Sequence, residues 1–261
     1  MFEVLGYVLF FFAGLFFGLF GSGGSIIILP ILIYLFDIPI YQATTYSLFL
    51  VFLITFFGTM KHLLSKNLHV EKIWVFILLT LICTGLSRTF LFPNIPSLIP
   101  ILNISKESFL MILFSIIILF SGLSMFQTDR ISIKDNFNIR LILIGVIVGI
   151  LTGLLGIGGG FIILPVLILF LSMDVKKAAT TTLFIIMLNT LLAILLEVTV
   201  FNFTFDLGFL FIVLFSSSMG LLTGVYFLNK IDVNLTKKLF SISLLLLSLI
   251  IFLLELYKIC T

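Results

Sequence analysis

The sequence predicts an all-α integral membrane protein built from two inverted repeats. Its composition, 62% hydrophobic and 10% charged residues with a mean hydropathy of +1.40, leaves too little polar surface to coat a soluble domain. Its apolar segments are long enough for helices that cross a hydrocarbon core, which takes roughly 20 residues. Its two parts also resemble each other in sequence.

The internal duplication is visible without gaps. Residues 14–55 placed on residues 149–190 give 18 identities in 42 positions. The glycine-rich sequence GSGGS at 21–25 aligns with GIGGG at 156–160, and Pro30 aligns with Pro165. A shared preference for Leu, Ile and Phe does not bring glycines and a proline into register, so the chain contains a duplicated membrane unit. Duplicated units with glycine-broken helices are typical of secondary transporters.

Eight apolar segments follow one another in two groups of four. They are 4–36, 43–60, 73–92 and 108–127, then 141–173, 178–197, 207–228 and 239–258. The first and fifth are too long for one ordinary span and carry the glycine clusters near their middles. Each part of such a segment reaches only ~18–25 Å as a helix. Each long segment is therefore either one kinked, tilted span or a re-entrant hairpin that returns to the side it entered from.

Charge favours the hairpin. Eleven of the 14 basic residues fall in four loops: Lys61, Lys66 and Lys72; Arg130, Lys134 and Arg140; Lys176 and Lys177; Lys230, Lys237 and Lys238. Basic loops stay in the cytoplasm, and two of these loops flank segment 141–173, so that segment must return.

Each repeat then contains one hairpin and three spans, and the odd number of spans turns the second repeat upside down. We predict repeat 1 at 1–127, a cytoplasmic connector at 128–140 and repeat 2 at 141–261. The hairpin tips should converge near the midplane. An outside start for the N-terminus rests on Glu3 and on the absence of basic residues before the first apolar segment.

The glycine tips suggest an anion site. A helix that begins inside the membrane presents unsatisfied N–H groups and the positive end of its dipole. The candidate substrate-binding residues at the tips are Gly21, Ser22, Gly23, Gly24, Ser25, Gly156, Gly158, Gly159 and Gly160. The alternative is that glycines only allow tight helix packing. We expect that role for Gly14 and Gly149, where alanine should be tolerated.

A few further polar residues lie within the apolar segments. Thr45, Ser47, Thr180 and Thr182 are candidates to line the path, or caps at the starts of spans. Ser217 and Ser218 are further candidate substrate-binding residues. With Ser216 they lie at mid-depth, and we expect at least two of the three hydroxyls to bond to their own helix. Arg88 either extends to the headgroups or attracts anions in an outward vestibule.

Acidic residues are expected only near the membrane surface. Glu197 and Glu255 lie near the ends of spans, where an interfacial carboxylate is the ordinary expectation. With no Asp, Glu or His at mid-depth, the sequence leaves open whether a proton or sodium ion is coupled to transport.

The repeated motifs resemble those of a known family. Gly14-x3-Gly18-x2-Gly21-x-Gly23-Gly24 with Pro30, followed by Ala43-x-Thr45-x-Ser47-Leu48, recurs as Gly149 to Pro165 and Ala178-x-Thr180-x-Thr182-Leu183. This pattern resembles the TauE/SafE family of sulfite exporters and related anion permeases. The resemblance implies transport of small sulfur-containing anions, such as sulfite, thiosulfate, sulfonates or sulfoacetate, across a bacterial inner membrane.

The sequence thus predicts a multi-pass inner-membrane transporter of a small anion that alternates access around two glycine-rich tips. The alternatives are a passive anion channel and a non-transporting membrane assembly factor. No catalytic nucleophile or paired carboxylates indicate an enzyme. We expect no cofactor, no metal site and no nucleic-acid partner, and the oligomeric state is not predicted.

Overall fold

The computed structural model describes residues 2–21, 23–64, 73–100, 103–126, 137–171, 173–228 and 233–260. Nearly all of these residues are helical. The first part of the chain contains α1 (Phe2–Phe20), α2 (Ser25–Tyr34), α3 (Ile40–Leu64), α4 (Trp74–Leu86), the π-helical turn η1 (Ser87–Leu91), α5 (Phe92–Asn94), β1 (Leu98–Ile99), β2 (Ile104–Ser105) and α6 (Lys106–Phe126). The second part contains α7 (Phe137–Leu155), α8 (Gly160–Leu169), α9 (Val175–Thr199), α10 (Leu207–Leu228) and α11 (Val233–Cys260).

Six segments of the described chain are long and apolar enough to cross a membrane. They are Ile40–Met60, Trp74–Asn94, Lys106–Phe126, Lys177–Thr199, Leu207–Phe227 and Leu235–Cys260. Their outward surfaces carry large apolar side chains such as Phe57, Phe120 and Phe211. A soluble protein rarely exposes so much contiguous apolar surface, so these surfaces suit contact with lipid.

The two long apolar segments are each divided into two shorter helices at the glycine clusters. Gly21 follows α1 with φ +73° and Gly156 follows α7 with φ +66°, a left-handed conformation that glycine adopts without steric cost. Each glycine donates its N–H to a carbonyl four residues earlier, that of Phe17 or Thr152. The aligned glycines Gly21 and Gly156 therefore mark equivalent helix ends, those of α1 and α7.

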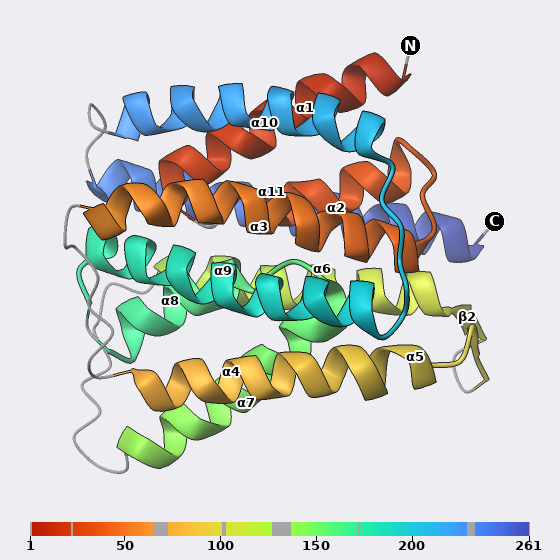
Figure 1. Cartoon of the computed structure of the whole chain (residues 1–261), viewed down its shortest axis with the longest axis horizontal. Helices are drawn as coiled ribbons and strands as arrows, with labels where there is room; N and C mark the ends of the chain where they lie inside the picture. Colours follow the sequence, from red (N-terminus) through yellow and green to blue (C-terminus); the bar gives the residue numbers. More distant parts are fainter. Residues whose placement is uncertain are drawn as a thin grey trace.

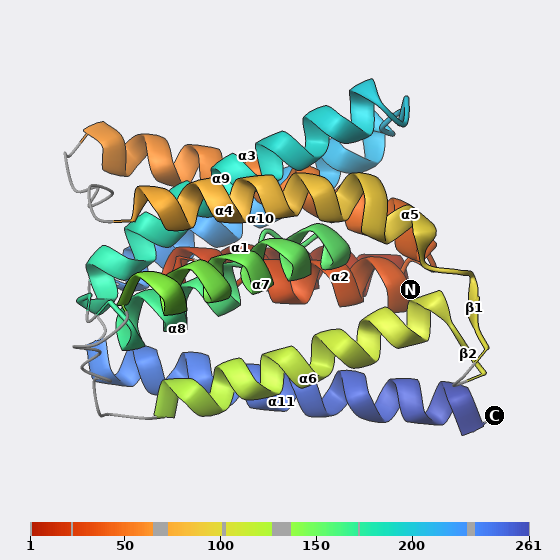
Figure 2. The same ribbon diagram turned by 90° about the horizontal axis from the view of Figure 1, so that it is seen from below.

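Figures 1 and 2 show that the helices run approximately along the long axis of the molecule. Helix α1 starts at the end of the bundle that carries both termini, and α2 returns to that end. Helix α7 starts at the opposite end, where α3, α6 and α10 finish, and α8 returns to it. The ribbon thus reverses direction inside the bundle at both glycine clusters.

The helices of the two parts pack reciprocally. Helix α1 packs on α10 and α7 packs on α4, while α3 packs on α9 and α6 packs on α11. The duplication places each residue of the first repeat 135 positions before its equivalent in the second, so α1 corresponds to α7 and α4 to α10. The contact of α1 with α10 is therefore equivalent to that of α7 with α4. Each part therefore depends on the other for its packing.

The glycines in these contacts allow backbones to approach closely. A Cβ added to Gly14 would lie 1.8 Å from the carbonyl oxygen of Ser217 on α10. At Gly149 it would lie 2.6 Å from the Cβ of Cys83 and 2.7 Å from the carbonyl oxygen of Thr80, both on α4. The expectation that alanine is tolerated here is wrong, because the obstacles include backbone atoms that cannot rotate away.

The end of the third apolar segment differs from the ordinary helix predicted for 73–92. Helix α4 continues into the π-helical turn, and β1 pairs antiparallel with β2 just beyond α5. Helix α5 ends at Asn94, and Ile95, the residue before Pro96, is extended, as expected because a following proline disfavours helical backbone.

Candidate functional site

A buried ion pair joins the two parts of the chain. Arg88, in the π-helical turn, contacts the carboxylate of Glu197 on α9 through its Nε, and both side chains are 0% exposed. The guanidinium also donates to Thr44 Oγ1 at 3.1 Å and to Thr45 Oγ1 at 2.9 Å, both on α3. The second carboxylate oxygen accepts a bond of 2.8 Å from the Tyr41 hydroxyl. We call these five side chains the Arg88 cluster.

Aromatic rings enclose the guanidinium. Its central carbon lies 4.3 Å from the centroid of the Phe92 ring and 5.8 Å from that of Tyr41. The ammonium of Lys106 lies 4.0 Å from the centroid of the same Phe92 ring and donates to the Phe92 carbonyl. Aromatic faces attract cations, and π-helical turns within helices are frequent at functional sites.

This arrangement corrects two expectations. Arg88 does not extend to the headgroups or into an open vestibule, since it is fully buried and paired. Glu197 and Glu255 lie near the ends of their helices but do not face the surroundings of the protein, because both are 0% exposed. The carboxylate of Glu255 on α11 accepts a bond of 2.5 Å from the Tyr34 hydroxyl on α2. Each of these carboxylates has a partner from a distant segment, so its burial could not be read from its position in a span.

The second glycine cluster lies beside the Arg88 cluster. A Cβ on Gly156 would lie 2.6 Å from the Cβ of Thr44, which the guanidinium contacts. A Cβ on Gly158, whose φ is +71°, would meet Ile186 on α9 at 2.6 Å and Val51 on α3 at 3.1 Å. The turn between α7 and α8 is therefore held between α3 and α9, within the protein interior.

Several buried polar side chains near this turn have no hydrogen-bond partner in the described part of the chain. They include the hydroxyls of Ser47 and Thr182, which are equivalent in the duplication, and both amide atoms of Asn189. Ser47 follows Thr44 by three residues on α3, and Thr182 and Asn189 lie one turn on either side of Ile186 on α9. Buried polar groups almost always have a partner, so these groups are suited to a polar solute or water.

The first glycine cluster faces other parts of α9 and α11. A Cβ on Gly21 would lie 3.0 Å from that of Ala179, and one on Gly23 would meet the Phe240 ring at 2.7 Å. Ala179 and Ile186 are seven residues apart, so the two glycine turns lie roughly 10 Å apart along α9. Ser22 lies outside the described residues.

The residues before the two returning helices differ in conformation. Gly24 before α2 has φ −70°, whereas Gly159 before α8 is left-handed with φ +70°. Ser25 and Gly160 are the first residues of these helices and are buried. A Cβ at Gly24 would lie 2.2 Å from the Ala13 carbonyl oxygen, so the two positions exclude side chains for different reasons.

The threonines near the starts of α3 and α9 do not cap these helices. Thr45 and Thr180 are each the sixth residue of their helix, so the expectation of capping is wrong. Thr45 donates to the Tyr41 carbonyl at 3.0 Å, which leaves its oxygen able to accept from Arg88. Thr180 donates to the Lys177 carbonyl at 2.9 Å and is not part of the Arg88 cluster.

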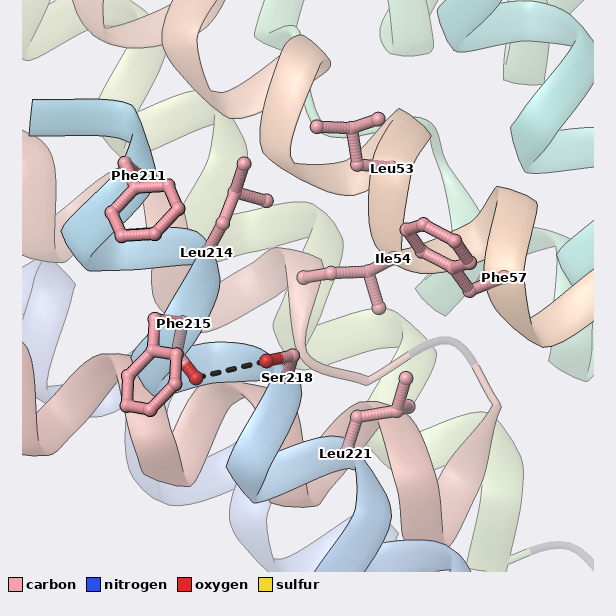
Figure 3. Close-up of a pocket in the computed structure, with 8 residues that line it drawn as sticks. All are labelled: Leu53, Ile54, Phe57, Phe211, Leu214, Phe215, Ser218 and Leu221. Atoms are coloured by element: carbon pink, nitrogen blue, oxygen red, sulfur yellow. Dashed lines mark hydrogen bonds between the residues drawn. The ribbon is translucent and has the colours of Figure 1, made fainter. Parts of the chain in front are cut away.

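The mid-depth serines bond as expected. Ser217 donates to the Val213 carbonyl and Ser218 to the Phe215 carbonyl, both in α10, while Ser216 donates to Tyr7 in α1. Figure 3 shows Ser218 in a cavity of about 290 Å³ between α3 and α10, surrounded by leucine, isoleucine and phenylalanine side chains. Ser217 and Ser218 therefore lie apart from the Arg88 cluster.

Comparison with known proteins agrees with this architecture. The family model described as sulfite exporter TauE/SafE matches residues 7–251. The chain belongs to the TauE/SafE family. It is 31% identical over 189 residues to a protein of Methanocaldococcus jannaschii described as a probable membrane transporter protein, an alignment that covers 69% of this chain and 67% of the relative. No solved structure matches it significantly.

Membership of TauE/SafE makes the chain a membrane transporter rather than a member of an enzyme family. Sequence reasoning identified the glycine turns and Arg88 of this TauE/SafE protein but missed Tyr41, Glu197 and Asn189. A signal for Glu197 was present: it and Arg88 are opposite charges within predicted apolar spans, where ionisable residues are rare and usually paired.

Proposed function

We propose that this TauE/SafE transporter carries a small sulfur-containing oxyanion, such as sulfite, thiosulfate or a short sulfonate, past the Arg88 cluster and the glycine turn between α7 and α8. The observation that carries the proposal is the fully buried guanidinium of Arg88, which is held beside the glycine turn between α7 and α8. Arginine presents several N–H donors in a plane that matches the oxygens of an oxyanion.

The path continues along α3 and α9. Ser47, Thr182 and Asn189 supply buried groups that hydrogen-bond a solute, and the helix starting at Gly160 supplies the positive end of its dipole. Irregular backbone at membrane depth is tolerated where protein buries it or water reaches it. These groups replace part of the hydration that the anion loses on entering the membrane.

Alternating access fits the division of the cluster between the two repeats. Arg88 and the α3 residues belong to repeat 1, at 1–127, and Glu197 belongs to repeat 2, at 141–261, so a movement of one repeat against the other opens or closes the cluster. The reciprocal helix packing and the two reversals of the ribbon support an inverted repeat in a multi-pass cell membrane protein. The basic loops would then face the cytoplasm.

The test is flux into proteoliposomes for a panel of sulfite, thiosulfate, methanesulfonate, chloride, sodium and a sugar. We expect saturable uptake of one or more sulfur oxyanions and none of the cation or sugar. Uptake of sodium or the sugar with no response to any sulfur oxyanion would contradict the proposal.

Two variants locate the site. Arg88→Gln should abolish oxyanion flux because it removes the buried cation. Gly159→Leu should do the same, since a side chain there meets Thr152 Oγ1 at 2.1 Å and forces a left-handed backbone. Ser218→Ala, in the apolar cavity, should keep wild-type flux. Normal flux in both site variants would place the path elsewhere.

A further inference from the structure

The positive charge of Arg88 is already neutralised within the protein. The guanidinium donates to Glu197, Thr44 and Thr45, and the two carboxylate oxygens accept from Arg88 and Tyr41. Phe92 covers one face of the guanidinium. Arg88 carries a single positive charge and Glu197 already neutralises it, so an anion that binds the guanidinium would leave an excess negative charge in the interior unless it displaces the carboxylate of Glu197.

A displaced carboxylate cannot remain charged at this position without a large cost. Glu197 is completely buried, and an unpaired ion in a protein interior is strongly destabilising. Burial and loss of an opposite charge both favour the neutral form of a carboxyl group. Taking up a proton removes the cost and leaves Arg88 as the charge that holds the anion.

We propose that Glu197 couples transport to protons. The anion replaces the carboxylate on Arg88, Glu197 binds a proton from the same side of the membrane, and both are released on the other side when the ion pair forms again. Arg88 stays charged throughout. The inference rests on the proposed anion transport and adds the coupling ion and the residue that carries it.

The surroundings of Glu197 contain few other titratable groups. Arg88 faces it from the π-helical turn and Tyr41 from α3, while Lys106 of α6 lies beyond the Phe92 ring. Helix α8 carries no titratable side chain, and the one basic residue in the sequence of α7 is Arg140, the fourth residue of a helix that begins at the end of the bundle opposite the termini. Helix α4 contributes only the thiol of Cys83.

The second buried carboxylate provides a matched control. Glu255 is as buried as Glu197 and accepts a bond from a tyrosine, Tyr34, in the same manner. Its partner is not a buried cation, and Lys258 nearby along α11 bonds instead to Glu107. Displacement by an anion therefore has no counterpart at Glu255.

The experiment uses the full chain in proteoliposomes with a pH-sensitive dye inside. Thiosulfate and methanesulfonate are the probes, because they bind no proton near neutral pH and any proton movement then belongs to the protein. An inward thiosulfate gradient should acidify the interior. In Glu197→Gln, the thiosulfate that crosses should carry no proton, so the acidification per thiosulfate and its dependence on a pH gradient should be lost, whereas Glu255→Gln should keep both.

The outcomes separate the two proposals. Thiosulfate flux without proton movement in the wild-type protein would overturn coupling and leave anion transport intact. Absence of flux for every sulfur oxyanion would overturn both. Coupling that survives in Glu197→Gln, or is lost in Glu255→Gln alone, would overturn the assignment to Glu197.

A second measurement covers the case in which Glu197→Gln does not fold. Carbodiimides modify protonated buried carboxyl groups, and mass spectrometry of the wild-type protein locates the product. Thiosulfate should increase modification of Glu197 and leave that of Glu255 unchanged. An unchanged or lower yield at Glu197 would overturn the proposal.

Discussion

Removal of the charge of Arg88 should destabilise the protein far more than removal of an exposed charge. In Arg88→Gln, Glu197 loses its cationic partner while remaining completely buried, and two threonine hydroxyls lose their donor. Breaking a buried pair by removing one partner costs about 3–5 kcal/mol. We therefore expect a decrease of that size in the free energy of unfolding.

The double variant Arg88→Gln/Glu197→Gln should recover much of this loss. Two neutral amides hydrogen-bond to each other and leave no buried charge, so the effects of the two changes should not add. Neighbouring residues in one network typically deviate from additivity by about 0.5–3 kcal/mol. The free energies of unfolding of the wild type, the two single variants and the double variant can be measured by SDS titration in mixed micelles.

The chain supplies the exposed comparison. Lys258 and Glu107 form an ion pair of 2.5 Å in which the lysine side chain is 50% exposed. Exposed pairs contribute about 0–1 kcal/mol, so Lys258→Gln should change stability by no more than that. If Arg88→Gln costs no more than Lys258→Gln, or if the double variant shows the sum of its single effects, Arg88 and Glu197 do not form a buried pair.

Two further predictions follow from the packing and the topology. Gly14→Ala should destabilise the protein by at least about 2 kcal/mol in the same assay, because the added methyl group would overlap the Ser217 carbonyl. The control is Gly58→Ala, where the nearest neighbour of the methyl group lies at 3.4 Å, and it should be neutral or stabilising by about 0.5–1 kcal/mol. Equal effects of the two changes would contradict the close contact of α1 with α10. In a background without the native cysteines, Lys177→Cys should resist an impermeant thiol reagent added outside cells and Asn103→Cys should react. Lys177 is in the first turn of α9 and Asn103 directly precedes β2, and α9 begins at the end of the bundle opposite β2; labelling of both positions would refute the topology.

Local signals predicted most of the helices. The proposed segments 207–228 and 108–127 differ by at most two residues from α10 and α6. The glycine clusters were expected to interrupt the two longest segments, and both segments are divided there. These features depend on short-range rules, namely the length of apolar sequence and the backbone freedom of glycine, so one sequence is enough to read them.

The candidate site was only partly predictable. Arg88 was recognised as unusual, but its burial was not, because the acceptors that make burial tolerable come from α3 and α9, 43 to 109 residues away in sequence. Glu197 was dismissed for the same reason. The opposite error occurred at Gly14, where the sequence suggested packing but not that a carbonyl oxygen occupies the space of the missing methyl group.

The sequence alone determined that this protein is a helical membrane protein, that it is duplicated, that its two longest segments break at glycines and that it resembles the TauE/SafE family. Composition, periodicity and repeated glycines are properties of the chain before it folds. The tertiary structure decided which polar groups meet. A charge inside the membrane is stable only with a partner, and that partner is selected by how α4, the π-helical turn and α3 each pack against α9, contacts that leave no mark in the local sequence.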